Sequence, residues 1–126
     1  MVTLDSAQHV NECTSWREQL RSFKTEMAQL GEQLQQSASH QHNKEILTSV
    51  EHFQNQFYIQ QINIHDLKQA VKLHERKLQL EMAGTPDGNI SEDSIQKHEE
   101  LFGEYQSLTS TLQELKDDFR NFLSKA

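Results

Sequence analysis

The sequence of 126 residues has few of the residues that interrupt helices, because it contains one proline and four glycines. Its single cysteine excludes a disulfide within the chain. It also lacks a run of about 18 apolar residues, so no segment is expected to span a bilayer. The first residues show neither the basic nor the apolar region of a signal peptide, and we therefore expect a cytoplasmic protein.

Positive charge is also scarce. The chain carries 12 Lys and Arg against 19 Asp and Glu, which gives a net charge of −7. Nucleic-acid binding and adsorption on anionic lipid both need a basic surface, so neither partner is expected. The sequence contains no glycine-rich phosphate loop, no G-x-S-x-G nucleophile motif and no Cys-x-x-Cys pair. We therefore predict no enzymatic activity and no cofactor.

Apolar residues make up 34% of the sequence, and in three long stretches they recur at alternating spacings of three and four. This spacing keeps one stripe of a helix facing its neighbours over many turns. The first stripe is Cys13, Trp16, Leu20, Phe23, Met27, Leu30 and Leu34. The second is Ile46, Val50, Phe53, Phe57, Gln60, Ile64, Leu67, Val71, His74 and Leu78. The third is His98, Leu101, Tyr105, Leu108, Leu112, Leu115, Phe119 and Phe122.

The three stripes predict an all-α fold, an antiparallel up-down-up three-helix bundle with long, coiled-coil-like helices at about 3–36, 42–83 and 91–124. The whole chain, 1–126, is expected to form one domain. The topology, Trp16 in the first helix and the long middle helix resemble spectrin-type three-helix repeats. This resemblance is one of shape, and it implies no functional residues.

Two connections are expected, near residues 37–42 and at 84–89. In the second, Gly84 is predicted to cap the preceding helix, Pro-Asp-Gly to form a turn, and Ser91 to cap the next helix. Folding the chain about residues 40 and 86 gives a register. It places Cys13 opposite Leu67, and it places His74 in one layer with His98.

Three polar side chains interrupt the stripes. Gln60 is expected to specify the register, since a buried amide penalises slipped pairings. The layer of His74 and His98, with His9, Ser6 and Asp5 nearby, contains the ingredients of a metal site. The structural alternative is that histidine tolerates the half-wet end of a bundle. Cys13 is interpreted as a small buried hydrophobe without a basic partner.

A second apolar row lies half a turn from the main stripe of the middle helix. This outer row consists of Tyr58, Ile59, Ile62, Leu73 and Leu80. Because it should face water, it predicts a contact surface. The main hypothesis is a non-enzymatic protein that acts through protein contact, most simply as a homodimer. The alternatives are a chaperone or adaptor that binds a client helix, and a small metal-binding bundle that uses His74 and His98.

Overall fold

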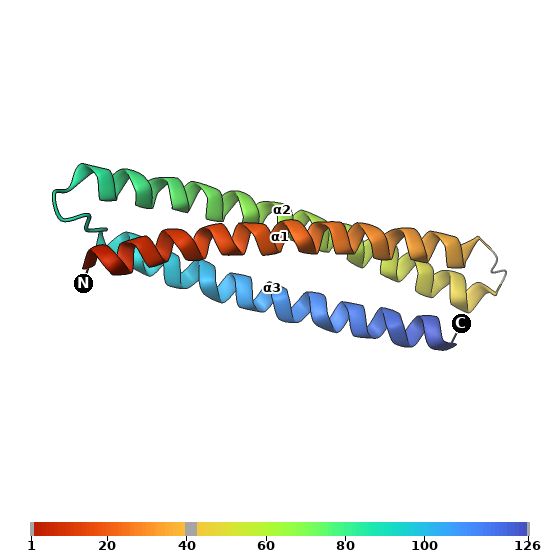
Figure 1. Cartoon of the computed structure of the whole chain (residues 1–126). Helices are drawn as coiled ribbons and strands as arrows, with labels where there is room; N and C mark the ends of the chain where they lie inside the picture. The colour runs from red at the N-terminus through yellow and green to blue at the C-terminus, as the bar shows by residue number, and fades with distance from the viewer. Residues whose placement is uncertain (1, 40–42, 126) are drawn as a thin grey trace.

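The computed structural model describes residues 2–39 and 43–125, with side chains from residue 6 onward. Its three helices are α1 (Val2–Ala38), α2 (Lys44–Gly84) and α3 (Glu92–Lys125). They run up, down and up along one elongated bundle, with the two connections at opposite ends (Figure 1). The predicted fold class is therefore confirmed, and the helix limits agree with the expected ones to within about two residues.

Side-chain caps start the second and third helices. The Oδ1 atom of Asn43 accepts the backbone N–H of Glu45 at 2.8 Å, which makes Asn43 the N-cap of α2. The Oγ atom of Ser91 accepts the N–H of Ser94 at 3.2 Å, and the predicted cap of α3 is confirmed. The first connection was predicted at 37–42, but α1 continues to Ala38. Residues 40–42 lie outside the described residues.

The cap predicted at Gly84 is wrong. Gly84 is the last residue of α2, and Thr85 follows it in an extended conformation with φ of −122°. The positive φ belongs instead to Gly88, at 68°, where the chain leaves the turn. The N–H of Gly88 donates to the carbonyl of Thr85 at 3.2 Å, with Pro86 at the second position, as expected for a β-turn.

Glu81 holds this second connection together from the last turn of α2. Its Oε1 atom accepts the N–H of Ser91 at 2.7 Å, and its Oε2 atom accepts the hydroxyl of Ser94 at 2.6 Å. Burial alone would raise the pKa of Glu81, but these hydrogen bonds outweigh it, and the pKa lies below its usual value. One carboxylate thus joins the end of α2 to the start of α3.

The apolar core runs along the whole bundle axis. It contains Cys13, Trp16, Leu20, Phe23, Met27, Leu34, Val50, Phe53, Phe57, Ile64, Leu67, Val71, Leu78, Leu101, Leu108, Leu112, Leu115 and Phe119. Aromatic rings gather near the first connection, where Phe53 packs edge-on against Phe119 with ring centroids 5.4 Å apart. Trp16 is buried as predicted, but in a second group of rings near the other end. None of the described helices has the length and apolar character needed to cross a membrane.

The register between α2 and α3 agrees with the prediction, because His74 meets His98 and Phe53 meets Phe119. The predicted register between α1 and α2 is wrong by about one heptad. Cys13 lies beside His74 and His98 instead of level with Leu67. One heptad is about 10.5 Å along a helix, and a connection of a few extended residues can span that distance. The position of the connection therefore fixes the topology but not the register.

Candidate functional site

Three helices each contribute one side chain to a buried cluster of two histidines and a cysteine. Cys13 comes from α1, His74 from α2 and His98 from α3, each from the stripe that faces the bundle axis, and all three are buried. The Nε2 atom of His74 lies 3.1 Å from Nδ1 of His98. The Sγ atom of Cys13 lies 3.9 Å from the same Nδ1 atom. We call these three residues the His–Cys cluster.

His98 is oriented from its other side by α1. Its Nε2 atom lies 3.3 Å from Oε1 of Glu12, a carboxylate that can only accept. The ring proton of His98 is therefore placed on Nε2, and Nδ1 presents its lone pair to the cluster. The ring of Trp16 stacks on His98 with centroids 4.7 Å apart, and the ring of His9 lies 4.1 Å from it. These rings shield the cluster and hold the imidazole in one plane.

The cluster has fewer hydrogen-bond acceptors than it needs. The thiol of Cys13 and a proton on Nε2 of His74 would both compete for the single lone pair on Nδ1 of His98. If His74 carried its proton on Nδ1 instead, two lone pairs would face each other at 3.1 Å. In the described part of the chain, Nδ1 of His74 is the one buried side-chain nitrogen or oxygen without a partner. Such groups are rare in folded proteins and call for an explanation.

Burial keeps the cluster uncharged. It lowers the pKa of His74 to about 4, with a further contribution from the neighbouring His98 and His9. Burial also lowers the pKa of His98, against the opposing effect of Glu12. Burial raises the pKa of Cys13 to about 12, and the nearby carboxylates of Glu75 and Glu12 add to the shift. At neutral pH the cluster therefore consists of two neutral imidazoles and a thiol.

A partly buried ion pair ties α1 to α2 beside the cluster. Arg17 donates from Nε to Oε2 of Glu75 at 2.7 Å and from Nη2 to Oε1 at 3.1 Å. The hydroxyl of Thr14 donates to Oε1 at 2.7 Å. Burial would raise the pKa of Glu75, but the hydrogen bonds from Arg17 and Thr14 bring it below its usual value. Because this bidentate ion pair forms only in the observed register, it helps to select that register.

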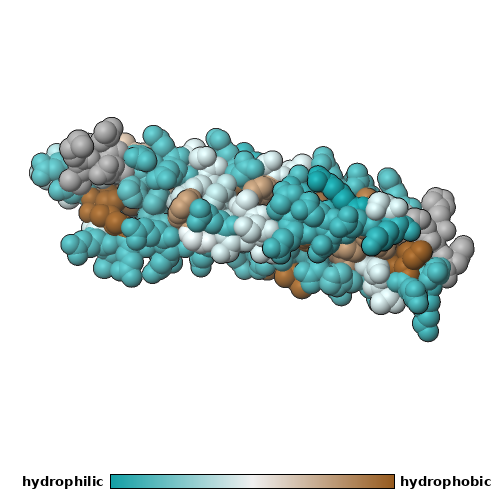
Figure 2. Space-filling view, turned by 90° about the horizontal axis from the view of Figure 1, so that it is seen from below, coloured by the Kyte–Doolittle hydropathy of each residue, from teal (hydrophilic) through white to brown (hydrophobic). Residues whose placement is uncertain are grey.

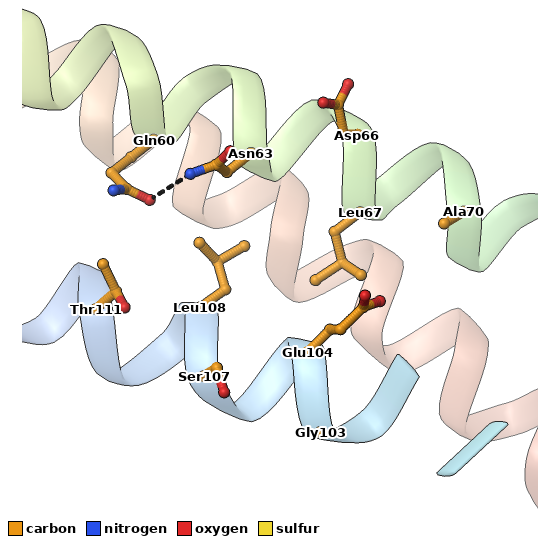
Figure 3. Close-up of a pocket in the computed structure, with 10 residues that line it drawn as sticks. All are labelled: Gln60, Asn63, Asp66, Leu67, Ala70, Gly103, Glu104, Ser107, Leu108 and Thr111. Atoms are coloured by element: carbon orange, nitrogen blue, oxygen red, sulfur yellow. Dashed lines mark hydrogen bonds between the residues drawn. The ribbon is translucent and has the colours of Figure 1, made fainter. Parts of the chain in front are cut away.

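An open groove lies between α2 and α3 in two parts that share Ala70, and its second part borders His74 of the cluster. Its first part, about 710 Å³, is lined by Gln60, Asn63 and Leu108 among others (Figure 3). Its second part, about 500 Å³, includes His74 and Lys77 in its lining. In Figure 3 the amides of Gln60 and Asn63 point toward each other, and Nδ2 of Asn63 donates to Oε1 of Gln60 at 3.2 Å.

The outer row of α2 is exposed, as the sequence predicted. The exposed fractions of its five side chains lie between 43% for Ile62 and 69% for Tyr58. By contrast, Figure 2 views the bundle from the side of α3 and shows mostly hydrophilic side chains with small, separate apolar patches. Phe102 on α3 is also 41% exposed, but its ring stacks on Trp16 with centroids 5.8 Å apart.

The structure brings together part of the predicted metal layer. His74 and His98 are in contact, while His9 lies against the ring of His98 and outside the His–Cys cluster. The side chain of Asp5 lies outside the described residues. The prediction missed Cys13 and Glu12, because it used the wrong heptad for α1. A signal was present, since a shift by one heptad aligns the one cysteine of the first stripe with the histidines of the other two.

No protein-family model, no curated protein and no solved structure matches this chain. Two features of the described residues stand out as candidate functional sites, the buried His–Cys cluster and the exposed outer row of α2.

Proposed function

We propose that this chain is a non-enzymatic helical-bundle protein that acts through protein contact, and that it pairs with a second copy of itself through the outer face of α2. The observation that carries the proposal is the exposed outer row, from Tyr58 to Leu80. The 22 helical steps from Tyr58 to Leu80 extend about 33 Å, which is long enough for an interface between two helices. Extended apolar rows of this kind on soluble proteins commonly mark contact surfaces.

The outer face of α2 is complementary to itself under a two-fold rotation. If two copies lie antiparallel with the axis near residue 71, side chains at equal distances from that residue meet. The pairs are Ile62 with Leu80, Asp66 with Arg76, and Gln69 with Leu73. All six side chains are exposed in the single chain. This pattern joins Ile62 to Leu80 and the opposite charges of Asp66 and Arg76, with Gln69 beside Leu73 near the axis, as expected in an antiparallel pair of helices. Tyr58 and Ile59 lie opposite Gly84 and Ala83 at the two ends of the contact.

The distribution of charge favours the same face. Segment 44–84, which is α2, contains five basic and five acidic residues, although the whole chain has a net charge of −7. The excess of negative charge therefore lies on α1, α3 and the second connection. Two copies that meet through α2 keep their acidic helices apart, which minimises the repulsion between like-charged chains.

A client helix could occupy the same face, but self-complementarity favours a second copy. A client would have to supply its own apolar and charged partners, whereas a second copy carries them in the correct order. The proposal therefore predicts a homodimer in the absence of any other protein.

Light scattering across a dilution series tests the dimer. We expect a mass of twice 14.7 kDa at high micromolar concentration, falling toward 14.7 kDa on dilution. The variant Ile62→Glu with Leu73→Glu should remain monomeric, because four carboxylates would be brought into the contact. Leu47→Glu is the matched control, since Leu47 is 40% exposed on α2 but lies outside the stretch that would overlap. A wild-type chain that stays monomeric at high concentration would contradict the proposal.

A further inference from the structure

We propose that Cys13, His74 and His98 form a binding site for Zn²⁺ or a similar borderline-soft divalent cation, with Glu12 orienting His98 from outside the coordination sphere. One sulfur and two imidazole nitrogens are the ligand types that such cations prefer. The site takes one ligand from each helix, so a bound ion would join all three helices at one level. This site is independent of the outer face of α2.

The distances between ligand atoms fit a tetrahedral ion. Zn–N bonds of about 2.0–2.1 Å and a Zn–S bond of about 2.3 Å place two nitrogens about 3.4 Å apart and sulfur about 3.6 Å from nitrogen. The observed separations are 3.1 Å between His74 Nε2 and His98 Nδ1, and 3.9 Å between Cys13 Sγ and His98 Nδ1. One ligand atom from each of the three side chains lies within 4.8 Å of the other two. Small side-chain shifts are enough to complete the geometry.

The surroundings of His98 match those of a metal-bound histidine. Metal-bound histidines commonly donate their second ring N–H to a carboxylate, which fixes the tautomer and the ring plane. Glu12 occupies this position, 3.3 Å from Nε2 of His98. Trp16 and His9 pack against the ring and leave Nδ1 directed at Cys13 and His74.

A cation held by Nε2 of His74 and Nδ1 of His98 would also remove the competition for the one lone pair on Nδ1 of His98, and the ring proton of His74 would then lie on Nδ1. As protein groups alone, the thiol of Cys13 and Nε2 of His74 both lie against the same Nδ1 atom of His98, which can accept only one proton. A cation accepts the lone pairs of the sulfur and both nitrogens at once. Cys13 would bind as a thiolate, so its thiol proton is released to solvent as the Zn–S bond forms. The groove borders the cluster at His74, and three protein ligands leave a fourth position for water.

A second group of ligand types, His9, Glu12 and His98, lies on the opposite side of the His98 ring. His9 and Glu12 are half-exposed, and both come from α1. This group would use Nε2 of His98 and could bind without Cys13. The two alternatives therefore differ in whether the thiolate is a ligand, which an experiment can decide directly.

Titration of the tag-free full-length chain with Co²⁺, followed by competition with Zn²⁺, tests the site. We expect one ion per chain, a visible spectrum typical of tetrahedral cobalt, and a near-ultraviolet thiolate-to-cobalt charge-transfer band. Zn²⁺ should remove the cobalt bands and raise the melting temperature of the chain. The absence of a charge-transfer band, or of any shift in melting temperature, would overturn the proposal.

Variants assign the ligands. Cys13→Ser should remove the charge-transfer band. Cys13→Ser and His98→Ala should each weaken Zn²⁺ binding by about 100-fold or more, whereas Glu12→Gln should weaken Zn²⁺ binding by about 10–100-fold. His65→Ala, which removes an exposed histidine elsewhere on α2, should bind as the wild type does. Far-ultraviolet circular dichroism confirms that each variant is folded. If His9→Ala abolished binding and Cys13→Ser did not, the site would be the half-exposed group and the proposal would be wrong.

Discussion

Replacing Gln60 by leucine should make the protein more stable. Gln60 occupies a position of the apolar stripe and is only 6% exposed. Its carbonyl oxygen accepts one hydrogen bond, from Asn63, and lies at the edge of the groove between α2 and α3. Asn63 is exposed, so after the substitution its amide can turn to water without being left unpaired. The change therefore removes a weakly held buried amide and leaves no buried donor behind.

The magnitude follows from two opposing contributions. Burying a leucine side chain is worth about 1.5–3 kcal/mol, and the lost hydrogen bond had contributed about 0.5–1.5 kcal/mol. The net gain in the free energy of unfolding is then about 1 kcal/mol. For a chain of 126 residues the unfolding entropy is about 0.26 kcal/mol/K, so the melting temperature should rise by about 4 °C.

Thermal melts followed by circular dichroism check this value at one fixed protein concentration, because pairing makes the melting temperature depend on concentration. Gln54→Leu is the matched control, since Gln54 is an exposed glutamine of α2 and its replacement should change stability by less than about 0.5 kcal/mol. A fall of several degrees for Gln60→Leu would refute the reasoning. It would mean that the amide makes a contact that leucine cannot replace.

Three further predictions concern other polar groups. Arg17→Ala should destabilise the chain by about 1.5–3 kcal/mol in urea denaturation, because it leaves the buried carboxylate of Glu75 without its cation. Glu75→Ala should destabilise it less, because Arg17 can then reach water, and equal losses would contradict this. Glu81→Gln should lower the free energy of unfolding by about 1 kcal/mol at pH 7. Because folding lowers the pKa of Glu81, this difference from wild type should be full above about pH 4.5 and should vanish as the pH falls through the pKa of Glu81 in the folded chain. A difference independent of pH would rule that out. Cys13 should react with iodoacetamide far more slowly than free cysteine at pH 7, until urea unfolds the chain; rapid labelling of the folded chain would show that the thiol is exposed.

The sequence was sufficient to predict the topology, because each helix shows its buried stripe through spacing alone. It also identified the outer row, since Ile59 and Leu73 lie on the side of α2 that faces away from its core-facing stripe, and both are exposed. Local caps were predictable where one side chain decides them, as at Ser91. The cap expected at Gly84 was not predictable in this way. Thr85, which follows the last residue of α2, is extended, and the left-handed conformation lies at Gly88.

The register between α1 and α2 could not be predicted from spacing. A heptad stripe matches its neighbour equally well after a slip of seven residues, so apolar spacing gives several equivalent solutions. Specific polar contacts distinguish between them, above all the pair of Arg17 with Glu75, which lies off the stripe on both helices. The composition of the His–Cys cluster depends on that register. For this reason the sequence identified His74 and His98 but not Cys13.

Charge exchange across the proposed dimer tests its central claim most directly. Asp66→Arg and Arg76→Asp should each weaken self-association by about tenfold or more, because each places two like-charged pairs in the contact. Mixed in equal amounts, the two variants should form a heterodimer in sedimentation experiments, since every arginine then meets an aspartate. A mixture that associates no better than either variant alone would contradict the antiparallel pairing of α2.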